Sequence, residues 1–429
     1  MQTDNPSAAG RTNGAYAGHG PGLPVVVIGA GPVGLAAAIQ LLKRNIPVVV
    51  FEAGTSAGSN ISTWGHVQMF SPWRSNLDDT CTALLRESGW QSPPLDHCPT
   101  GKEFLDHYLH RLAAMPSLAS TVRWGTRVAA VSRKGLGRTR ADNRATRPFE
   151  LTTVEPSGRT QRMNAAAVID ASGAWGQHAP LGASGLPALG EGKCRDRISY
   201  GMPDIAGADR RRYMGKRLLV VGSGYSAIGN LVACGELIDL DPRTKVFWAL
   251  RSADITRALG KSADNYPQTR RLRDRLGALL SAAKIKALSP FELEAIEADG
   301  SGSLVVQGYE QDERRAVAVD HIISATGVRP DFSIHSELWL ELNPVFECAK
   351  GIACLIDPTT HSCGSIRLHG ANELAHPEPN FFIVGMKSYG RASTFLLPNG
   401  YEQARSVAAY LAGDVKQAAP RMNAVPCNG

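Results

Sequence analysis

Two stretches of the chain repeat the same order of hydrophobic and polar positions. Residues 25–28 are consecutive β-branched residues, which indicates a strand buried on both faces of a sheet. The glycine-rich residues 29–34 follow, and residues 35–43 are predicted to form a helix. Further apolar strands are expected over residues 46–51 and over residues 167–173, which end in small residues. This order is that of a βαβ unit with a closing strand.

The second half of the chain repeats the arrangement. Strands are expected over residues 217–221 and 245–250. Between them lie the glycine-rich residues 222–227 and a helix predicted over residues 227–236, and residues 321–327 form a closing strand with a small-residue exit. Two such units predict an α/β fold with two Rossmann-like dinucleotide-binding domains.

The segment before each closing strand has a different pattern. Residues from about 120–164 and about 286–318 alternate apolar and polar positions around glycine turns. Alternation with a period of two is typical of strands with one buried face. We therefore expect two antiparallel β-meanders, inserted so that each covers one of the sheets.

The first glycine-rich loop has the features of a dinucleotide site. Gly29 permits a tight turn, Gly31 lets backbone amides approach a pyrophosphate, and Gly34 allows close packing of helix and strand. Glu52 ends the next strand about 20 positions further on, where an acidic side chain accepts hydrogen bonds from a ribose. The helix N-terminus supplies oriented N–H groups to the phosphates.

The second loop differs at two positions. It carries Gly222 and Gly224, with the small residue Ala227 in the third place. The following strand ends at Arg251 instead of an acidic residue, and a guanidinium there suits a 2′-phosphate, with Arg257 as a second contact. This favours NADPH over NADH. The alternative is a solvated arginine at a strand end.

Two nucleotide domains in one chain resemble the two-dinucleotide-binding-domain flavoproteins. The resemblance covers roughly residues 24–413. Thr326 and Gly327 lie in a sequence, SATGVRPD, that resembles the linker leading back to the first domain, and residues 170–173 resemble its earlier counterpart. Gly385 ends a run, NFFIVG, that resembles the last strand of the first domain. The resemblance implies FAD in the first domain and NADPH in the second.

The chain departs from this pattern after that last strand. Many relatives carry an aspartate there that holds a ribitol hydroxyl, whereas this chain has Met386 and Lys387. The ribitol contact is therefore left unassigned. The next helix, expected from about Asn399 and Gly400 through Ala412, is positioned to aim its N-terminal amides at the pyrimidine edge of the flavin.

These inferences divide the chain into five segments, with the NADPH-binding domain inserted into the FAD-binding domain. Residues 1–22 contain no apolar run, and both terminal segments are expected to be tails. The segments are a tail at 1–22, the first portion of the FAD-binding domain at 23–195, the NADPH-binding domain at 196–325, the second portion of the FAD-binding domain at 326–415, and a tail at 416–429.

Cysteine spacing and an aromatic segment bear on the flavin chemistry. The eight cysteines include no C-x-x-C or C-x4-C pair, which flavin-linked disulfide reductases require. Residues 64–73, bounded by Trp64 and Trp73, resemble the aromatic segment that wraps the flavin in flavin monooxygenases. The motif F-x-G-x-x-x-H-x-x-x-W, which is the fingerprint of Baeyer–Villiger monooxygenases, is missing. Together with residues 361–364 and 387–391, the segment is most similar to flavoproteins encoded in arsenic-resistance operons.

The resemblance implies an NADPH- and O2-dependent FAD monooxygenase. Such an enzyme oxygenates a small soft nucleophile, at sulfur, nitrogen or trivalent arsenic, through a C4a-hydroperoxyflavin, while the protein orients the cofactor and excludes water. We expect Arg74 and Lys387 to place positive charge near the flavin and His66 to hydrogen-bond its ring system. The alternatives are surface positions for the two cations and a core position for the histidine.

Two other functions remain open from the residues. One alternative to the monooxygenase is a flavin oxidoreductase that passes electrons to a quinone, metal or protein acceptor without oxygen insertion. The other is a redox-sensing scaffold without turnover. Cys348, Cys354, His361, Cys363 and Cys427 gather near the C-terminus, and thiolates are good ligands for soft metalloids. Incidental free thiols are the alternative, and no resident metal site is predicted.

Composition and charge limit the remaining possibilities. The chain of 429 residues has 43% hydrophobic residues and a net charge of +7, so it is typical of a folded globular protein. The Arg-rich stretches 133–147 and 207–217 lack interleaved aromatic residues and are interpreted as solvated loops, not as nucleic-acid or membrane surfaces. Free thiols and the lack of a signal-like segment predict a cytoplasmic protein. Its expected partners are a small substrate and O2, and a homodimer is left open.

Overall fold

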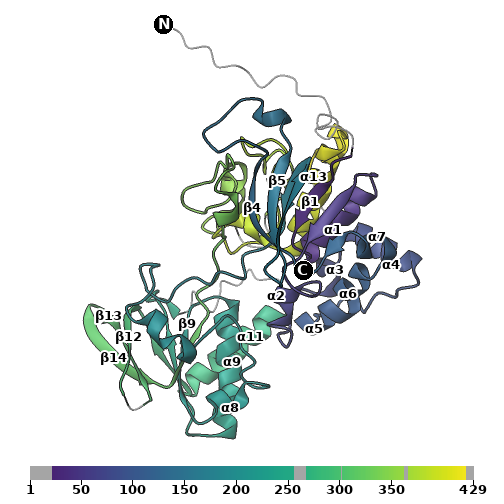
Figure 1. Cartoon of the computed structure of the whole chain (residues 1–429). Helices are drawn as coiled ribbons and strands as arrows, with labels where there is room; N and C mark the ends of the chain where they lie inside the picture. The colour runs from purple at the N-terminus through teal and green to yellow at the C-terminus, as the bar shows by residue number, and fades with distance from the viewer. Residues whose placement is uncertain (1–21, 256–266, 301, 362–365, 422–429) are drawn as a thin grey trace.

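The protein folds into two lobes that are joined by two crossing segments (Figure 1). The computed structural model describes residues 22–255, 267–300, 302–361 and 366–421. Each lobe contains a five-stranded parallel sheet and a three-stranded antiparallel sheet. The predicted α/β class with two Rossmann-like domains is confirmed.

The first lobe is built on a parallel sheet whose central strand is apolar at every position. All four residues of β1 are buried, because helices cover one face and the first meander the other. Helix α1 (Pro32–Leu42) leaves β1 through the first glycine loop and packs against α13 (Leu397–Leu411). The strands in sheet order are β16 (Phe381–Ile383), β7 (Ala167–Asp170), β1 (Val25–Ile28), β2 (Val48–Phe51) and β3 (Val122–Arg123).

The second lobe has the same order of connections. Its central strand β9 continues through the second glycine loop into α9 (Tyr225–Leu240), which runs four residues beyond the predicted helix end and packs against α11 (Pro267–Ser281). The strands in sheet order are β11 (Ile285–Leu288), β10 (Lys245–Ala249), β9 (Arg217–Val221), β15 (His321–Ser324) and β8 (Ile198–Tyr200).

Both predicted meanders are present. Each pairs its strands in antiparallel fashion and precedes the closing strand of its lobe. The first meander comprises β4 (Arg127–Arg133), β5 (Phe149–Val154) and β6 (Thr160–Ala165), and the second comprises β12 (Phe291–Ala298), β13 (Leu304–Glu310) and β14 (Glu313–Val319).

Short helices between β2 and β3 were not predicted, because most of them are too short to show a helical period. No helix among the described residues is long and apolar enough to span a membrane. The short helices of this region are α2 (Ser59–Ser62), α3 (Trp73–Asn76), α4 (Asp79–Glu87), α5 (Gly101–Phe104), η2 (Leu105–Leu109), α6 (His110–Ala113) and α7 (Pro116–Ala119). Elsewhere lie η3 (Arg144–Thr146), η4 (Glu191–Arg197), α8 (Arg210–Tyr213), η5 (Ser333–His335), η6 (Lys350–Ile352), α12 (Ala353–Ile356), η7 (Gly385–Tyr389) and α14 (Val415–Ala418).

A buried ionic cluster joins the first meander to the segment before β16. The Glu378 carboxylate accepts hydrogen bonds from Arg133 Nε at 2.7 Å and from Arg144 Nη2 at 2.7 Å, and none of the three side chains is more than 2% exposed. The backbone N–H of Trp339 donates to the same carboxylate at 3.0 Å. Removal of any one of these three charged side chains should destabilise the fold, because the remaining charges would stay buried without compensation.

We expect the substitution Glu378→Ala to lower the free energy of unfolding by about 3–5 kcal/mol, because it leaves two buried guanidinium groups unpaired. The matched control is Glu341→Ala, which removes an exposed partner of Lys350 and should cost less than about 1 kcal/mol. Urea unfolding at neutral pH measures both. Equal losses in the two variants would contradict the role given to the cluster.

Candidate functional site

A cavity of about 2830 Å³ lies where the two lobes meet. It is lined by Gly29 and Gly31 at the carboxyl end of the first parallel sheet and by Gly224 and Tyr225 at the carboxyl end of the second. Parallel α/β sheets bind their ligands at these ends. The volume exceeds that of pockets for a single drug-sized ligand, which are typically about 300–1,000 Å³, so the cavity has room for more than one molecule.

The first glycine loop is shaped by contacts between backbone atoms. A Cβ atom on Gly34 would lie 2.0 Å from the carbonyl oxygen of Gly29, so only glycine lets α1 pack this closely on β1. Gly29 has φ +101°, a backbone conformation that residues with a Cβ atom rarely adopt. A Cβ on Gly31 would meet no protein atom within 4 Å, so this position faces open space. The N-terminus of α1 has no side-chain cap, which leaves its amides available to an anion.

The second glycine loop has the same construction. A Cβ on Gly222 would lie 2.3 Å from the carbonyl oxygen of Ala325, and Gly224 faces open space as Gly31 does. The side chain of Ala227 is fully buried in the second-lobe core, so alanine is small enough for the third position. Helix α9 also begins without a side-chain cap. Each lobe therefore carries one backbone cradle with a free helix N-terminus.

The residues predicted to select the ribose occupy the ends of equivalent strands. Glu52 follows β2, and its carboxylate accepts hydrogen bonds from the backbone N–H of Ala30 and of Gly54, each at 2.7 Å. Arg251 follows β10; its side chain is exposed, and Nη1 donates to the carbonyl oxygen of Ala183 at 3.2 Å. Glu52 lines the cavity, whereas Arg251 lies outside its lining. Arg257 falls outside the described residues.

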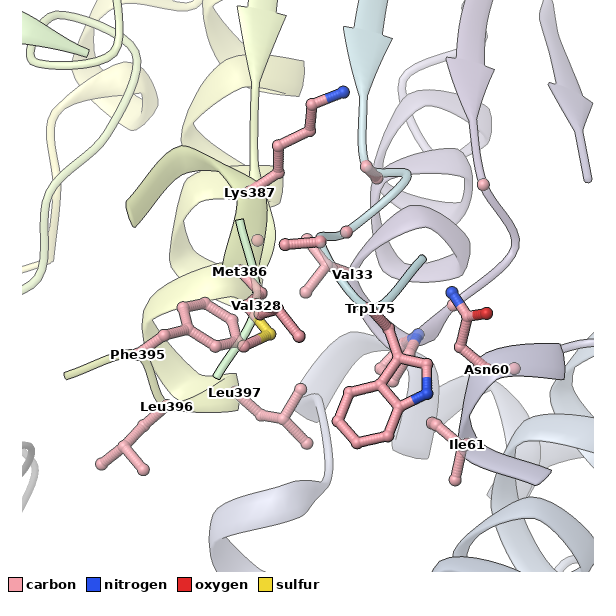
Figure 2. Close-up of a pocket in the computed structure, with 18 of the residues that line it drawn as sticks. Val33, Asn60, Ile61, Trp175, Val328, Met386, Lys387, Phe395, Leu396 and Leu397 are labelled. Atoms are coloured by element: carbon pink, nitrogen blue, oxygen red, sulfur yellow. The ribbon is translucent and has the colours of Figure 1, made fainter. Parts of the chain in front are cut away.

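Lys387 forms a buried ion pair. Its Nζ lies 2.6 Å from Asp170 Oδ2, and both side chains are at most 2% exposed. Lys387 also donates to Ser172 Oγ at 3.2 Å, and His335 Nε2 lies 3.2 Å from the same Asp170 oxygen. The ammonium group points away from the space between Trp175 and Leu397 (Figure 2).

The electrostatics of this cluster follow from burial and pairing. Burial by itself raises the pKa of Asp170, but the charge of Lys387 and the other neighbours outweigh it and bring that pKa to about 2. Burial lowers the pKa of His335 to about 4, so this ring is neutral at pH 7. The positive charge of Lys387 is therefore compensated inside the fold, at the carboxyl ends of β7 and β16.

The turn after β16 is held from inside by α13. The backbone N–H of Gly385 donates to Gln403 Oε1 at 2.7 Å, and Gln403 in turn donates to Ser388 Oγ at 2.9 Å. Asn399 is buried and donates to the Tyr389 hydroxyl at 2.8 Å, so its side chain braces the turn. Helix α13 has no side-chain cap, and its first residues line the cavity.

Gly400 allows α13 to pack closely on α1. A Cβ added to this glycine would lie 2.5 Å from Cγ2 of Val33 in the first turn of α1. Both helices begin at the cavity, since Val33 and the residues around the start of α13 line it (Figure 2). A larger residue at position 400 would separate the two N-termini.

The aromatic segment divides into a cavity face and a core face. Trp64 lines the cavity and packs on Trp175, with ring centroids 6.2 Å apart. Trp73 is 1% exposed and packs on Phe104 in the core, outside the cavity lining. His66 is exposed and also lies outside the lining.

The same segment contacts the second lobe. Phe70 and Tyr225 have ring centroids 5.6 Å apart, and Gln268 donates to Gln68 Oε1 at 2.7 Å. Tyr225 is the first residue of α9, directly after Gly224. Arg74 lines the cavity near this interface and is ion-paired with Asp96.

The linkers between the lobes carry further lining residues. Thr326 donates to the carbonyl oxygen of Ala179 at 2.6 Å, which ties the second linker to the first, and Gly327 lines the cavity beside it. Trp175 in the first linker was missed from the sequence, although its position just after the exit turn of β7 is a signal that could have identified it. Ile61 was missed as well, because nothing in its local pattern marks a short helix at the cavity.

These observations define a class of protein before any comparison. Two backbone cradles, each with a free helix N-terminus, fit the diphosphates of two dinucleotides. Glu52 is suitably placed for a ribose hydroxyl, and the uncapped start of α13 faces the cavity between the cradles. Among the described residues, no group of three or more histidine, cysteine and acidic side chains is arranged to hold a metal ion. The fold is that of a protein that binds two dinucleotides.

The family comparison assigns the chain more narrowly. Residues 23–345 match the family described as pyridine nucleotide-disulphide oxidoreductases, and the chain belongs to that family. It is therefore an oxidoreductase that uses FAD and a pyridine nucleotide. A search of curated protein sequences finds no match.

Solved structures with the same fold fall into two functional groups. Bacillithiol disulfide reductase from Bacillus cereus matches with a TM-score of 0.68 at 17% identity, over 91% of this chain and 98% of the other. The cadaverine monooxygenase DfoA from Erwinia amylovora, bound to FAD, matches with a TM-score of 0.62 at 13% identity, over 95% and 97%. The ornithine N-hydroxylase KtzI from Kutzneria sp. 744 matches with a TM-score of 0.59 at 17% identity, over 92% and 98%. These likenesses establish the fold and do not choose between disulfide reduction and oxygenation.

The two glycines of the first loop should respond differently to the same added methyl group. Gly31→Ala should fold normally and bind FAD at least about tenfold more weakly, because its methyl group occupies only the open cradle. Gly34→Ala should destabilise the apoprotein by about 1–3 kcal/mol or more, because its methyl group meets backbone. Thermal unfolding of the apoproteins and FAD titration separate the two effects. Loss of stability in Gly31→Ala would contradict the open cradle.

Proposed function

We propose that the protein is an NADPH- and O2-dependent FAD monooxygenase that oxygenates a small soft nucleophile at sulfur, nitrogen or trivalent arsenic. In the balanced reaction, the substrate, O2, NADPH and a proton give the oxygenated product, NADP⁺ and water. FAD, when bound in the first cradle, would supply the two-electron chemistry that links NADPH to oxygen. The chain itself has to hold both cofactors, exclude water and position the substrate.

The observation that carries the proposal is the wall of the cavity between the cradles. Disulfide reduction through a dithiol of the enzyme would need a pair of cysteines beside the flavin. Among the described cysteines, only Cys98 lines the cavity, while Cys354 is exposed elsewhere and the others are buried outside it. A described wall with a single thiol offers no dithiol and supports oxygenation, the reaction for which the cadaverine and ornithine enzymes of the same fold are named.

Residues of the chain take separate roles in this proposal. The glycine loops hold the diphosphates of FAD and NADPH, Glu52 holds the FAD ribose, and the start of α13 lies at the cavity without a side-chain cap. Lys387 is a positioning residue, because its charge is already paired with Asp170 and its contact joins the loops after β7 and β16. Arg74 is the cation that we assign to the cavity rim.

The arsenic resemblance makes a trivalent arsenical one candidate substrate. Cys348 is a poor resting thiolate, because burial raises its pKa to about 11. Cys354 is exposed, and its carbonyl oxygen lies 3.2 Å from His361 Nε2. Cys363 and Cys427 lie outside the described residues. The raised pKa of Cys348 favours arsenic as a substrate in the cavity over arsenic bound by a resting thiolate at this position.

Electron transfer without oxygen insertion is the second candidate function, because the disulfide reductases share the fold. Isotope labelling distinguishes oxygenation from electron transfer without oxygen insertion. We expect the FAD-loaded enzyme with NADPH and oxygen-18-labelled dioxygen to place one labelled atom into a thioether, an amine or a trivalent arsenical. Mass spectrometry of the product measures this. Rapid NADPH oxidation with a quinone, and no labelled product from any of the three, would favour the electron-transfer function.

Arg251 should determine the preference for NADPH. Replacing it by alanine removes a charge-assisted contact, so KM for NADPH should rise about 10- to 100-fold while KM for NADH stays within about twofold. Steady-state kinetics with both nucleotides measure the effect. Arg243→Ala is the matched control, because Arg243 is an exposed arginine before β10, at the opposite end of the same strand. Equal losses for the two nucleotides in Arg251→Ala would refute a phosphate contact.

A further inference from the structure

A buried series of hydrogen bonds, which we call the His369 relay, joins His369, Gln403, Ser388 and Gly385. His369 lies on the segment that leads to β16, and Gln403 lies on α13. The side chains of His369 and Gln403 are fully buried, and Ser388 is 1% exposed. We propose that His369 is a positioning residue that holds the turn after β16 in place for FAD only while its ring is uncharged. The inference needs FAD, which the family uses, and does not depend on oxygenation.

The turn after β16 borders the first cradle. Gly385 begins this turn with φ +71°, and a Cβ atom on it would lie 3.4 Å from Cβ of Val33, in the first turn of α1. Gly385, Met386 and Lys387 line the cavity, and the side chains of Met386 and Lys387 leave the turn in different directions (Figure 2). The turn therefore contacts the helix whose N-terminus fits the diphosphate. Movement of Gly385 would change the shape of the FAD site.

Donors and acceptors fix the orientation of the Gln403 amide. The backbone N–H of Gly385 is a donor, so the amide atom 2.7 Å from it has to be the acceptor, Oε1. Nε2 of Gln403 then donates to Ser388 Oγ at 2.9 Å and to His369 Nε2 at 2.8 Å. The Ser388 hydroxyl can accept, because it donates its own proton to the carbonyl oxygen of Gly385 at 2.7 Å.

The same reasoning fixes the tautomer of His369. Its Nδ1 lies 3.2 Å from the carbonyl oxygen of Arg367, which only accepts, so Nδ1 carries the ring proton. Nε2 keeps a lone pair and accepts from Gln403. The neutral ring therefore satisfies both of its nitrogens and the amide of Gln403, in an interior without solvent access.

A second proton on His369 would break the relay at one of two places. If the Gln403 amide keeps its orientation, the new Nε2–H of the ring faces the amide N–H. If the amide turns over, its oxygen accepts from the ring, but its NH2 group then faces the backbone N–H of Gly385. In both cases two buried donors oppose each other, which is unfavourable. The charged ring therefore disfavours the geometry of the turn after β16.

The groups around the ring determine where it titrates. Burial is the largest cause and lowers the pKa of His369 below the ordinary value of about 6.5, and the charge of Arg367 acts in the same direction. The Arg367 carbonyl, Glu373 on the same segment and Glu402 on α13, which is itself ion-paired, act to raise that pKa. Tyr389, at the end of the turn, adds an aromatic ring with its centroid 5.6 Å from that of the imidazole. Because burial outweighs the two carboxylates, the ring is neutral at pH 7.

The test measures FAD binding as a function of pH. Equilibrium dialysis of the full chain against FAD, from about pH 8 to about pH 5.5, gives Kd. The bound form excludes the second proton, so Kd should be constant above the ordinary histidine pKa and rise at least about threefold by the acid end. His369→Gln, whose amide oxygen can accept from Gln403 but does not titrate, should bind FAD within about threefold of wild type at the alkaline end and lose the acid dependence.

A reversed charge pattern gives a second test should His369→Gln fail to fold. Gln403→Glu places a carboxylate beside the ring, which favours the protonated form. In this variant FAD should bind more tightly at the acid end of the range than at the alkaline end, opposite to wild type. His107→Gln, at an exposed histidine outside the cavity lining, should keep the wild-type profile.

Three outcomes would overturn the inference: a wild-type Kd that does not change with pH, an acid loss that persists in His369→Gln, and a profile in Gln403→Glu that is not reversed. Binding is measured without NADPH or a substrate. Failure of the oxygenation reaction would therefore leave this result intact and would overturn only the proposed function.

Discussion

Contact between backbone atoms at two strand–helix turns is the constraint on which the whole arrangement depends. In the first lobe, the absent side chain of Gly34 lets α1 lie against the turn at Gly29, and in the second, Gly222 lies against the carbonyl of Ala325. The close approach leaves the helix N-termini uncapped and directed at the cavity. An added methyl group on Gly34 would displace α1 from the first cradle, and one on Gly222 would meet the backbone of Ala325 after β15.

Buried charges hold the chain segments that surround these turns. The pair of Asp170 and Lys387 joins the ends of two neighbouring strands in the first sheet, and the cluster around Glu378 joins the first meander to the segment before β16. Such pairs contribute little net stability compared with apolar packing, yet they penalise any other arrangement strongly because a separated charge would stay buried. They specify which loops meet at the cavity.

The cavity combines charged and apolar regions. Backbone amides at the two cradles match the phosphates of two cofactors, while Ile61, Trp175, Val328 and Leu397 line an apolar part of the same cavity. The segment from Trp64 to Trp73 contributes to both, since Trp64 packs on Trp175 and Phe70 packs on Tyr225 at the second cradle. The segment therefore contacts lining residues of both the linker and the second lobe.

Local sequence determined the two glycine turns, the buried strands and the meanders, because steric limits and hydrophobic periodicity act over a few neighbouring residues. Tertiary structure decided which side chains reach the cavity. Lys387 is paired with Asp170, Trp73 packs in the core, and Trp175 faces the open space, and none of these outcomes follows from the residues next to them. They depend on contacts between segments far apart in the chain, which a local pattern does not record.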